Sequence, residues 1–342
     1  MDNKKKYSLL ILAFGLLIGF VLAFWFIPEN RYIPKNNKAG LGTSRLGEEY
    51  RYNIEEYKQV DSERVLYTAL PGFKTGFDEA TGIIVDQNDK IYVCGDKGIR
   101  IVDIEGTLLE EIKGEDKLTA VEITREGIIY AAARDKVFFG GKDLFKKSFG
   151  KKGRKTGEFE YITSIKIMRG NLFIADAGNR RVSKYDLNGK YLGEFVKKDS
   201  KKGYKGFIIP SPHMDLGPDK DGSLWVANTG MLRLEKYSAE GVFLDSWGKS
   251  GVKPENFIGC CNPCNFTVTK DGDFVTSEKG LPRIKLYDKT GKFLGIAAPP
   301  SVFDEKCVNM ALAVDSKDRI YALDSVEKKV RVFVKTTKGN KR

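Results

Sequence analysis

Histidine and cysteine are scarce in this 342-residue chain, which has one histidine and five cysteines. A multi-histidine metal centre is therefore excluded, and a serine triad would have to recruit the one histidine, His213. The sequence has no Gly-x-Ser-x-Gly elbow, no Walker loop and no glycine-rich dinucleotide turn. It thus lacks the signatures of the common hydrolase, nucleoside-triphosphate and dinucleotide-binding classes.

Long apolar runs are equally rare, and the one that stands out is LLILAFGLLIGFVLAFWFI at residues 9–27. As a helix rising about 1.5 Å per residue, it is close to the roughly 30 Å hydrocarbon core of a bilayer. The lysines at residues 4–6 predict a cytoplasmic tail at residues 1–8 and an extracytoplasmic remainder. A cleaved signal peptide is the alternative, but its apolar region is usually shorter, and no lipobox cysteine follows. We therefore expect a single-pass signal anchor in the cell membrane, with the remaining chain on the periplasmic or cell-surface side.

The net charge is strongly positive, +12 at pH 7. In a cytosolic protein this charge would suggest nucleic acid as the partner, but an extracytoplasmic location removes nucleic acid from the compartment. Lysine-rich stretches at residues 146–155 and 197–205 could instead face anionic lipid, an envelope polymer or an acidic protein. The competing interpretation is a solvated loop surface, which is the usual role of charge runs.

Six copies of one β-rich phrase follow a polar linker at residues 28–57. Each copy has short strands separated by turn residues such as Asn-Asp, Glu-Gly and Asp-Gly. A marker residue in the second strand recurs at intervals of 38 to 52 residues: Tyr92, Tyr130, Phe173, Trp225, Val275 and Tyr321. A period of about 40 to 50 residues with four strands per unit is typical of a β-propeller blade.

The predicted fold is therefore all-β, a six-bladed β-propeller over residues 58–337 with a basic tail at residues 338–342. The run RVLYTAL at residues 64–70 precedes the first full repeat, whereas the last repeat lacks a fourth strand. We expect this run to complete the sixth blade, because closing the ring in this way leaves no exposed strand edge. Helix content outside the anchor should be low.

Two motifs recur in the middle of the chain. The segment IADAGNRRVSKYDLNGKYLGEF at residues 174–195 has an Asp-x-Gly-Asn-x-Arg turn before an apolar strand, and the linkers FGKKGRKTGEF (149–159) and WGKSGVKPENF (247–257) end in phenylalanine. In these features the chain resembles the NHL-repeat family. The phrase GCCNP at residues 259–263 together with TSEKGLPRIKLYD at residues 276–288 is similar to an exported, membrane-anchored subgroup of unassigned activity. The resemblance implies a propeller and no particular reaction, because propellers serve as binding modules and as enzymes.

A basic residue recurs five or six positions after the second strand of five repeats: Arg100, Arg181, Arg233, Arg283 and Lys329. Equivalent positions in a propeller form a ring, and such a ring could bind a carboxylate, a phosphate or a sulfated sugar. The competing interpretation is structural, with each cation bound to local carboxylates such as Asp176 or Glu278.

Four of the five cysteines lie near the predicted starts of inner strands: Cys260, Cys261, Cys264 and Cys307. His213 lies at a similar place in the fourth repeat. For an exported domain the favoured interpretation is a structural disulfide that joins Cys307 to Cys261 or Cys264 across two blades. Alternatively, Cys261, Cys264, Cys307 and His213 could together hold zinc. Cys261 and Cys264 could also be a redox pair, or the thiols could be free. Cys94, in the strand IYVCG, is expected to be buried.

Oxygen ligands also share one position of the repeat: Asp176, Asn228, Glu278 and Asp324. They could hold Ca²⁺, although capping of turns is the commoner role of such side chains. We expect no cofactor, with zinc or calcium as the alternative.

These features favour a membrane-anchored, extracytoplasmic propeller that binds or scaffolds a protein, an envelope polymer or a small anionic ligand at one mouth of the ring. The alternative is a metal- or thiol-dependent enzyme with its centre near residues 260–264. No catalytic residue is predicted, and the expected partners are the membrane and a protein or envelope polymer, with no nucleic acid.

Overall fold

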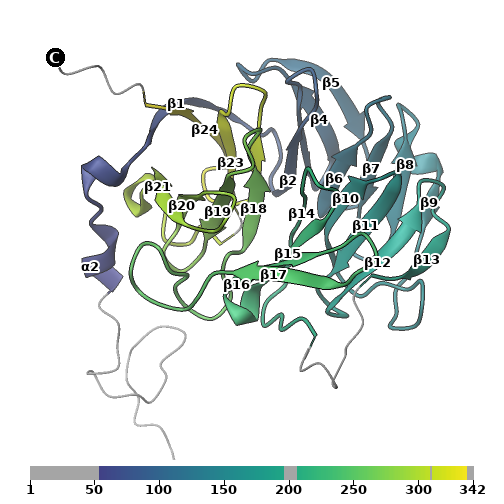
Figure 1. Ribbon diagram of the computed structural model, residues 1–342. Helices are drawn as coiled ribbons and strands as arrows, with labels where there is room; N and C mark the ends of the chain where they lie inside the picture. The colour runs from purple at the N-terminus through teal and green to yellow at the C-terminus, as the bar shows by residue number, and fades with distance from the viewer. Residues whose placement is uncertain (1–53, 196–205, 309, 337–342) are drawn as a thin grey trace, which may run out of the picture. The chain divides into compact units, whose positions relative to one another are not determined.

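The computed structural model describes residues 54–195, 206–308 and 310–336. These residues form six four-stranded antiparallel sheets, which are the blades of a propeller (Figure 1). The predicted six-bladed, all-β fold is confirmed. Each of the six marker residues lies in the second strand of its blade, as the repeat period predicts.

The first three blades are continuous in sequence. From the inner to the outer strand, blade one contains β2 (Ala80–Val85), β3 (Ile91–Gly95), β4 (Gly98–Val102) and β5 (Leu108–Lys113), blade two contains β6 (Ala120–Ile123), β7 (Ile129–Ala132), β8 (Val137–Gly140) and β9 (Ser148–Phe149), and blade three contains β10 (Ile162–Met168), β11 (Asn171–Asp176), β12 (Arg181–Asp186) and β13 (Tyr191–Glu194).

The other three blades include the point at which the ring closes. Blade four contains β14 (Leu216–Pro218), β15 (Leu224–Asn228), β16 (Arg233–Tyr237) and β17 (Phe243–Trp247), blade five contains β18 (Asn265–Val268), β19 (Phe274–Glu278), β20 (Arg283–Tyr287) and β21 (Phe293–Ala298), and blade six contains β22 (Leu312–Val314), β23 (Ile320–Asp324), β24 (Lys329–Lys335) and β1 (Tyr67–Lys74).

Helices are short in the described residues, as expected. They comprise α2 (Ile54–Lys58) and the 3-10 turns η2 (Ser62–Arg64), η3 (Leu144–Lys146), η5 (Thr229–Met231) and η6 (Pro300–Val302). No helix in residues 54–195, 206–308 and 310–336 is both long and apolar enough to cross a membrane. The predicted anchor at residues 9–27 lies outside these ranges, as does the lysine-rich stretch at 197–205.

The apolar core is divided into six clusters, each shared by two neighbouring blades. The middle strands of a blade are therefore covered on both faces, which explains why every residue of β3 and of β19 is buried, including the polar Thr276, Ser277 and Glu278 of β19. Outer strands such as β5 and β17 are largely exposed. The inner strands contact one another in a closed cycle, from β2 through β6, β10, β14, β18 and β22 back to β2, and so surround a central channel.

The ring closes as the sequence predicts, with β1 as the outermost strand of blade six. Strand β1 pairs antiparallel with β24, for example Tyr67 with Lys335 and Leu70 with Val332. The strand spans residues 67–74, so it begins and ends later than the predicted run at 64–70. A register shift follows Leu70, and Gly72 lies within it because a Cβ there would come within 2.2 Å of the Val330 carbonyl oxygen.

The repeated motif of blade three holds the linker that precedes it. The Asp176 carboxylate accepts hydrogen bonds from the backbone N–H groups of Glu160 and Tyr161, and Asn179 Nδ2 donates to the Gly153 carbonyl. Both phenylalanine-terminated linkers contain the same parallel bridge, Lys152 with Phe159 in one and Ser250 with Phe257 in the other. The motif therefore fixes the path of the chain from one blade to the next.

Candidate functional site

The inner strands begin at one mouth of the central channel, where several hydroxyl groups meet. Thr81, Thr119 and Thr163 lie at the starts of the inner strands of blades one to three. Two of them tie blades together, because Thr81 Oγ1 donates to the Leu118 carbonyl at 2.6 Å and Thr163 Oγ1 donates to the Met214 carbonyl at 2.7 Å.

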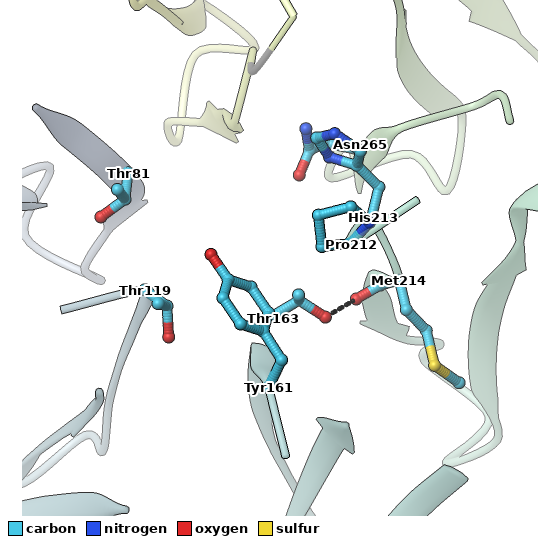
Figure 2. A pocket seen from close by; sticks show the side chains of 8 residues that line it. All are labelled: Thr81, Thr119, Tyr161, Thr163, Pro212, His213, Met214 and Asn265. Atoms are coloured by element: carbon cyan, nitrogen blue, oxygen red, sulfur yellow. Dashed lines mark hydrogen bonds between the residues drawn. The ribbon is translucent and has the colours of Figure 1, made fainter. Parts of the chain in front are cut away.

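A cavity of about 110 Å³ occupies this mouth, enough for several waters or a small organic molecule. Figure 2 shows its lining: Thr81, Thr119, Tyr161, Thr163, Pro212, His213, Met214 and Asn265. The Tyr161 hydroxyl and the Asn265 amide point into the space between the threonines and the Pro212–Met214 segment (Figure 2).

Three lining side chains have hydrogen-bonding capacity that the described part of the protein does not use. The Asn265 amide nitrogen is buried and has no hydrogen-bond partner. Neither the Tyr161 hydroxyl nor the His213 imidazole bonds to any described residue, although their backbones do. Buried polar groups are normally paired, so the Asn265 amide nitrogen, together with the unpaired groups of the half-buried Tyr161 and His213, marks the mouth as a place for a ligand.

His213 is neutral in this environment. Burial lowers its pKa from 6.5 to about 4, and the positive charge of Lys279 adds to the effect. The mouth is therefore lined by uncharged hydrogen-bonding groups at neutral pH.

This lowered pKa predicts an acid-sensitive fold. Between about pH 6.5 and 4 the histidine is protonated in the unfolded chain but neutral in the folded chain. The free energy of unfolding therefore falls as the pH falls through this range. We expect the wild-type protein to lose about 2 to 3 kcal/mol more than a His213→Gln variant between pH 7.5 and 4.5 in urea unfolding. Because His213 is the one histidine, its single Hε1 resonance should titrate near pH 4. A midpoint near 6.5 with equal pH dependence in both proteins would contradict the prediction.

A second cavity of about 40 Å³ shares Thr81, Thr119, Thr163 and Asn265 with the first and is also lined by Lys166 and Asp215. Lys166 Nζ lies 3.1 Å from a carboxylate oxygen of Glu122. Burial opposes the charge of Lys166, but Glu122 and Asp215 outweigh it and raise the pKa of Lys166 above its ordinary value. Burial raises the pKa of both carboxyl groups in turn, against the effect of Lys166. These carboxylates already have a cation as partner.

The structure does not form the predicted disulfide. All five cysteines are free. Cys264 lies inside blade five, where its Sγ bonds to the Ser277 carbonyl at 3.2 Å, whereas Cys307 Sγ lies 3.9 Å from the Ser325 hydroxyl of blade six. Each thiol thus has a partner in its own blade. Cys94 is buried, as expected.

The predicted metal site also finds no support, since the described residues contain no group of three or more histidine, cysteine, aspartate or glutamate side chains able to hold an ion. Three of the proposed calcium ligands accept hydrogen bonds from backbone N–H groups instead. The carboxylate of Asp176 caps the linker, Asp324 accepts from the backbone N–H groups of Val326 and Glu327, and Asn228 Oδ1 accepts from the Ile208 backbone N–H.

The predicted basic ring is only partly regular. Arg181, Arg233, Arg283 and Lys329 each lie opposite the last residue of the second strand, but Arg100 lies opposite Val93, further inside blade one. All five bind locally. Their partners are Glu111 for Arg100, the carbonyls of Arg154, Lys155 and Glu158 for Arg181, Glu235 for Arg233, Glu278 for Arg283 and Glu327 for Lys329. Ligand binding by this ring stays a prediction.

No family model and no curated protein matches the chain. Solved structures do. One is a streptogramin B lyase, 11% identical, with a TM-score of 0.55 over 79% of this chain and 98% of that one. Another is a gluconolactonase from Xanthomonas campestris, 13% identical, with a TM-score of 0.57 over 80% and 97%. The chain shares their propeller fold.

A third neighbour is a virginiamycin B lyase from Staphylococcus aureus, solved with quinupristin as a catalytically inactive histidine-to-alanine variant. It is 15% identical, with a TM-score of 0.52 over 80% of this chain and 89% of that one. Identities this low show the fold alone and carry no activity to this chain.

Sequence reasoning found His213 but missed Tyr161 and Asn265. A usable signal was present, because Thr81, Thr119, Thr163 and Asn265 each stand ten or eleven residues before the marker of their repeat. A polar residue at this position in four blades indicates a polar channel mouth.

Proposed function

We propose that this propeller binds a small, uncharged polar molecule at the mouth of its central channel. The observation that carries the proposal is the convergence of Tyr161, His213 and Asn265, whose polar groups are unpaired in the described protein, on one cavity. A hydroxyl- or carbonyl-rich ligand would accept from the Asn265 amide and the Tyr161 hydroxyl and could donate to the neutral imidazole. The absence of a charged group in the lining favours a neutral ligand over an anion.

The His213 Hε1 resonance provides a direct assay on the full-length chain. Glucose and glucono-1,5-lactone would serve as neutral probes and gluconate as a matched anion. We expect the neutral probes to shift the resonance and gluconate to leave it unchanged. Tyr161→Phe and Asn265→Ala should each weaken binding about five- to tenfold, the value of one hydrogen bond. The matched variants Tyr191→Phe and Asn188→Ala, in the outer part of blade three, should bind normally.

Selective binding of gluconate would overturn the neutral-ligand proposal. Loss of binding in Tyr191→Phe would place the ligand away from the mouth.

An enzymatic role is the second candidate. It is favoured by one observation, that a neutral imidazole without a described partner lines a cavity in a fold shared with a lyase and a gluconolactonase. Such an imidazole can accept a proton from a bound molecule. Turnover of glucono-1,5-lactone that disappears in His213→Gln, while glucose still binds, would favour catalysis over binding alone.

We also propose that the blades are of the NHL type. The support is the motif of blade three, where Asp176, Asn179 and Arg181 hold the linker through backbone groups.

Membrane anchoring through residues 9–27, an extracytoplasmic location and a protein or envelope-polymer partner belong to the same proposal and rest on the sequence. Fractionation of cells that express the full chain would test the anchor, since carbonate washing should leave the protein in the membrane pellet.

A further inference from the structure

Cys260 and Cys261 are set apart from the other thiols by their position. Cys94, Cys264 and Cys307 are fully buried, whereas Cys260 is exposed and Cys261 retains 9% exposure. The two Sγ atoms lie 3.2 Å apart, so each thiol is the other's nearest sulfur neighbour in the loop. The pair is thus accessible to a co-reactant from solvent.

The loop that carries the pair is held in place by Asn262. The Asn262 amide donates to the carbonyls of Ile258 and Lys279 at 2.6 and 3.1 Å, and its side-chain oxygen accepts from the Lys279 backbone N–H at 3.0 Å. These bonds hold the loop that contains the two cysteines next to Lys279, the residue that follows β19. The arrangement is built by the fold rather than left to a free loop.

Lys279 and Ser211 surround the sulfur of Cys261. Lys279 Nζ donates to Ser211 Oγ at 2.8 Å, and both side chains help to lower the pKa of the Cys261 thiol. Burial raises the pKa of the Cys261 thiol, but hydrogen bonds from Ser211 and Cys260 and the charge of Lys279 outweigh it, so that its pKa is lowered. Burial raises the pKa of Cys94 to about 12 and that of Cys264 to about 11. Thiolate character is therefore concentrated at Cys261.

We propose that Cys260 and Cys261 form a reversible dithiol–disulfide couple that exchanges with small disulfides. Adjacent Cα atoms are about 3.8 Å apart across a trans peptide, below the roughly 4.4 to 6.8 Å of ordinary disulfides. A bond between them is strained and easily reduced, which suits a labile couple and not a structural crosslink.

The exchange balances with a small disulfide as oxidant. The exposed Cys260 thiol passes its proton to the Cys261 thiolate 3.2 Å away, and the Cys260 sulfur attacks one sulfur of the co-reactant, whose S–S bond breaks and releases one thiolate that takes the proton from Cys261. The Cys261 thiolate then attacks Cys260 Sγ, forms the Cys260–Cys261 bond and releases the second thiolate. Two electrons pass from the cysteine sulfurs to the co-reactant, and the two thiol protons go to the released thiolates.

The test is a redox titration of the full-length chain with reduced and oxidised glutathione, followed by alkylation and peptide mass analysis. We expect the peptide containing both cysteines to lose two hydrogen masses and to regain them on reduction, while Cys94, Cys264 and Cys307 stay reduced. Cys261→Ser should stop at a stable glutathione adduct on Cys260, and Cys264→Ser should behave as wild type. These outcomes together establish the couple.

A charge variant tests whether disulfide formation depends on the positive charge of Lys279 and not only on the exposure of Cys260. Lys279→Met should slow formation of the internal disulfide at pH 7 by about three- to tenfold, and Lys279→Arg should restore most of the rate. The proposal is overturned if the pair stays reduced at every glutathione ratio, if it forms only intermolecular disulfides, or if a bound metal protects it from alkylation until chelator is added.

Discussion

Replacing Glu278 by alanine is expected to lower the free energy of unfolding by about 3 to 5 kcal/mol. Glu278, Arg283 and Lys285 are all within 1% of complete burial in blade five. Glu278 binds Arg283 Nε and lies 3.2 Å from Lys285 Nζ, so the substitution leaves two basic side chains in the core without their carboxylate partner. Burial already lowers the pKa of Lys285 to about 7. Denaturant unfolding of the full chain, read as the change in midpoint at constant m-value, measures the loss.

Glu327 provides the matched control. It lies 3.6 Å from Lys329, but its side chain is half exposed, and exposed ion pairs contribute little. We expect Glu327→Ala to change stability by less than about 0.5 kcal/mol. The loss of stability in Glu278→Gln, which keeps an acceptor for Arg283, should lie between the losses in Glu278→Ala and Glu327→Ala. Equal losses in Glu278→Ala and Glu327→Ala would show that the buried cluster adds no stability.

Asp215→Ala is expected to cost about 2 to 4 kcal/mol, because Asp215 joins three blades at the channel. One carboxylate oxygen accepts from the Ser164 hydroxyl of blade three at 2.7 Å, and the other accepts from the Phe266 backbone N–H of blade five at 3.0 Å. The alanine variant leaves both donors unpaired and removes one of the two carboxylates that stabilise Lys166. Thermal and urea unfolding would measure the loss.

Asp215→Asn separates the hydrogen bonds from the charge. Asparagine keeps one acceptor oxygen, so we expect it to lose about half as much as alanine. Ser164→Ala, which removes one donor while leaving the carboxylate, should cost about 1 kcal/mol. An alanine variant as stable as the asparagine variant would contradict this account.

The fold could be predicted because each repeat must bury its middle strands against two neighbours. That requirement places an apolar or aromatic residue such as Tyr92 or Trp225 at the same point of every blade, and it is visible as a period in the sequence. The closing strand was predictable for a related reason, since a propeller with an unpaired last blade would leave a strand edge exposed. The boundaries of β1 could not be predicted, because they are set by pairing with β24 and not by the local sequence pattern.

The site was harder to predict because its residues come from different blades, and the polar residue that recurs ten or eleven positions before the marker does not identify Tyr161 or His213. Tyr161 and Asn265 are separated by about a hundred residues and meet only once the ring has closed. The cysteines attracted attention through their spacing, yet the structure groups them differently. Cys264 bonds within blade five, and Cys261 is instead surrounded by Ser211, from the segment before β14, and by Lys279. Contacts between blades decide such partners, and the sequence does not encode them locally.

The pairing of β1 with β24 also has a consequence for how the protein is made. On the ribosome, β1 emerges early, and its partner follows only after about 250 further residues, which at about 5 to 20 residues per second means a delay of roughly 10 to 50 s. Throughout that interval β1 lacks the strand with which it pairs. Most of its side chains remain exposed even in the finished blade, so what β24 covers on arrival is chiefly the row of unpaired backbone groups along the waiting strand.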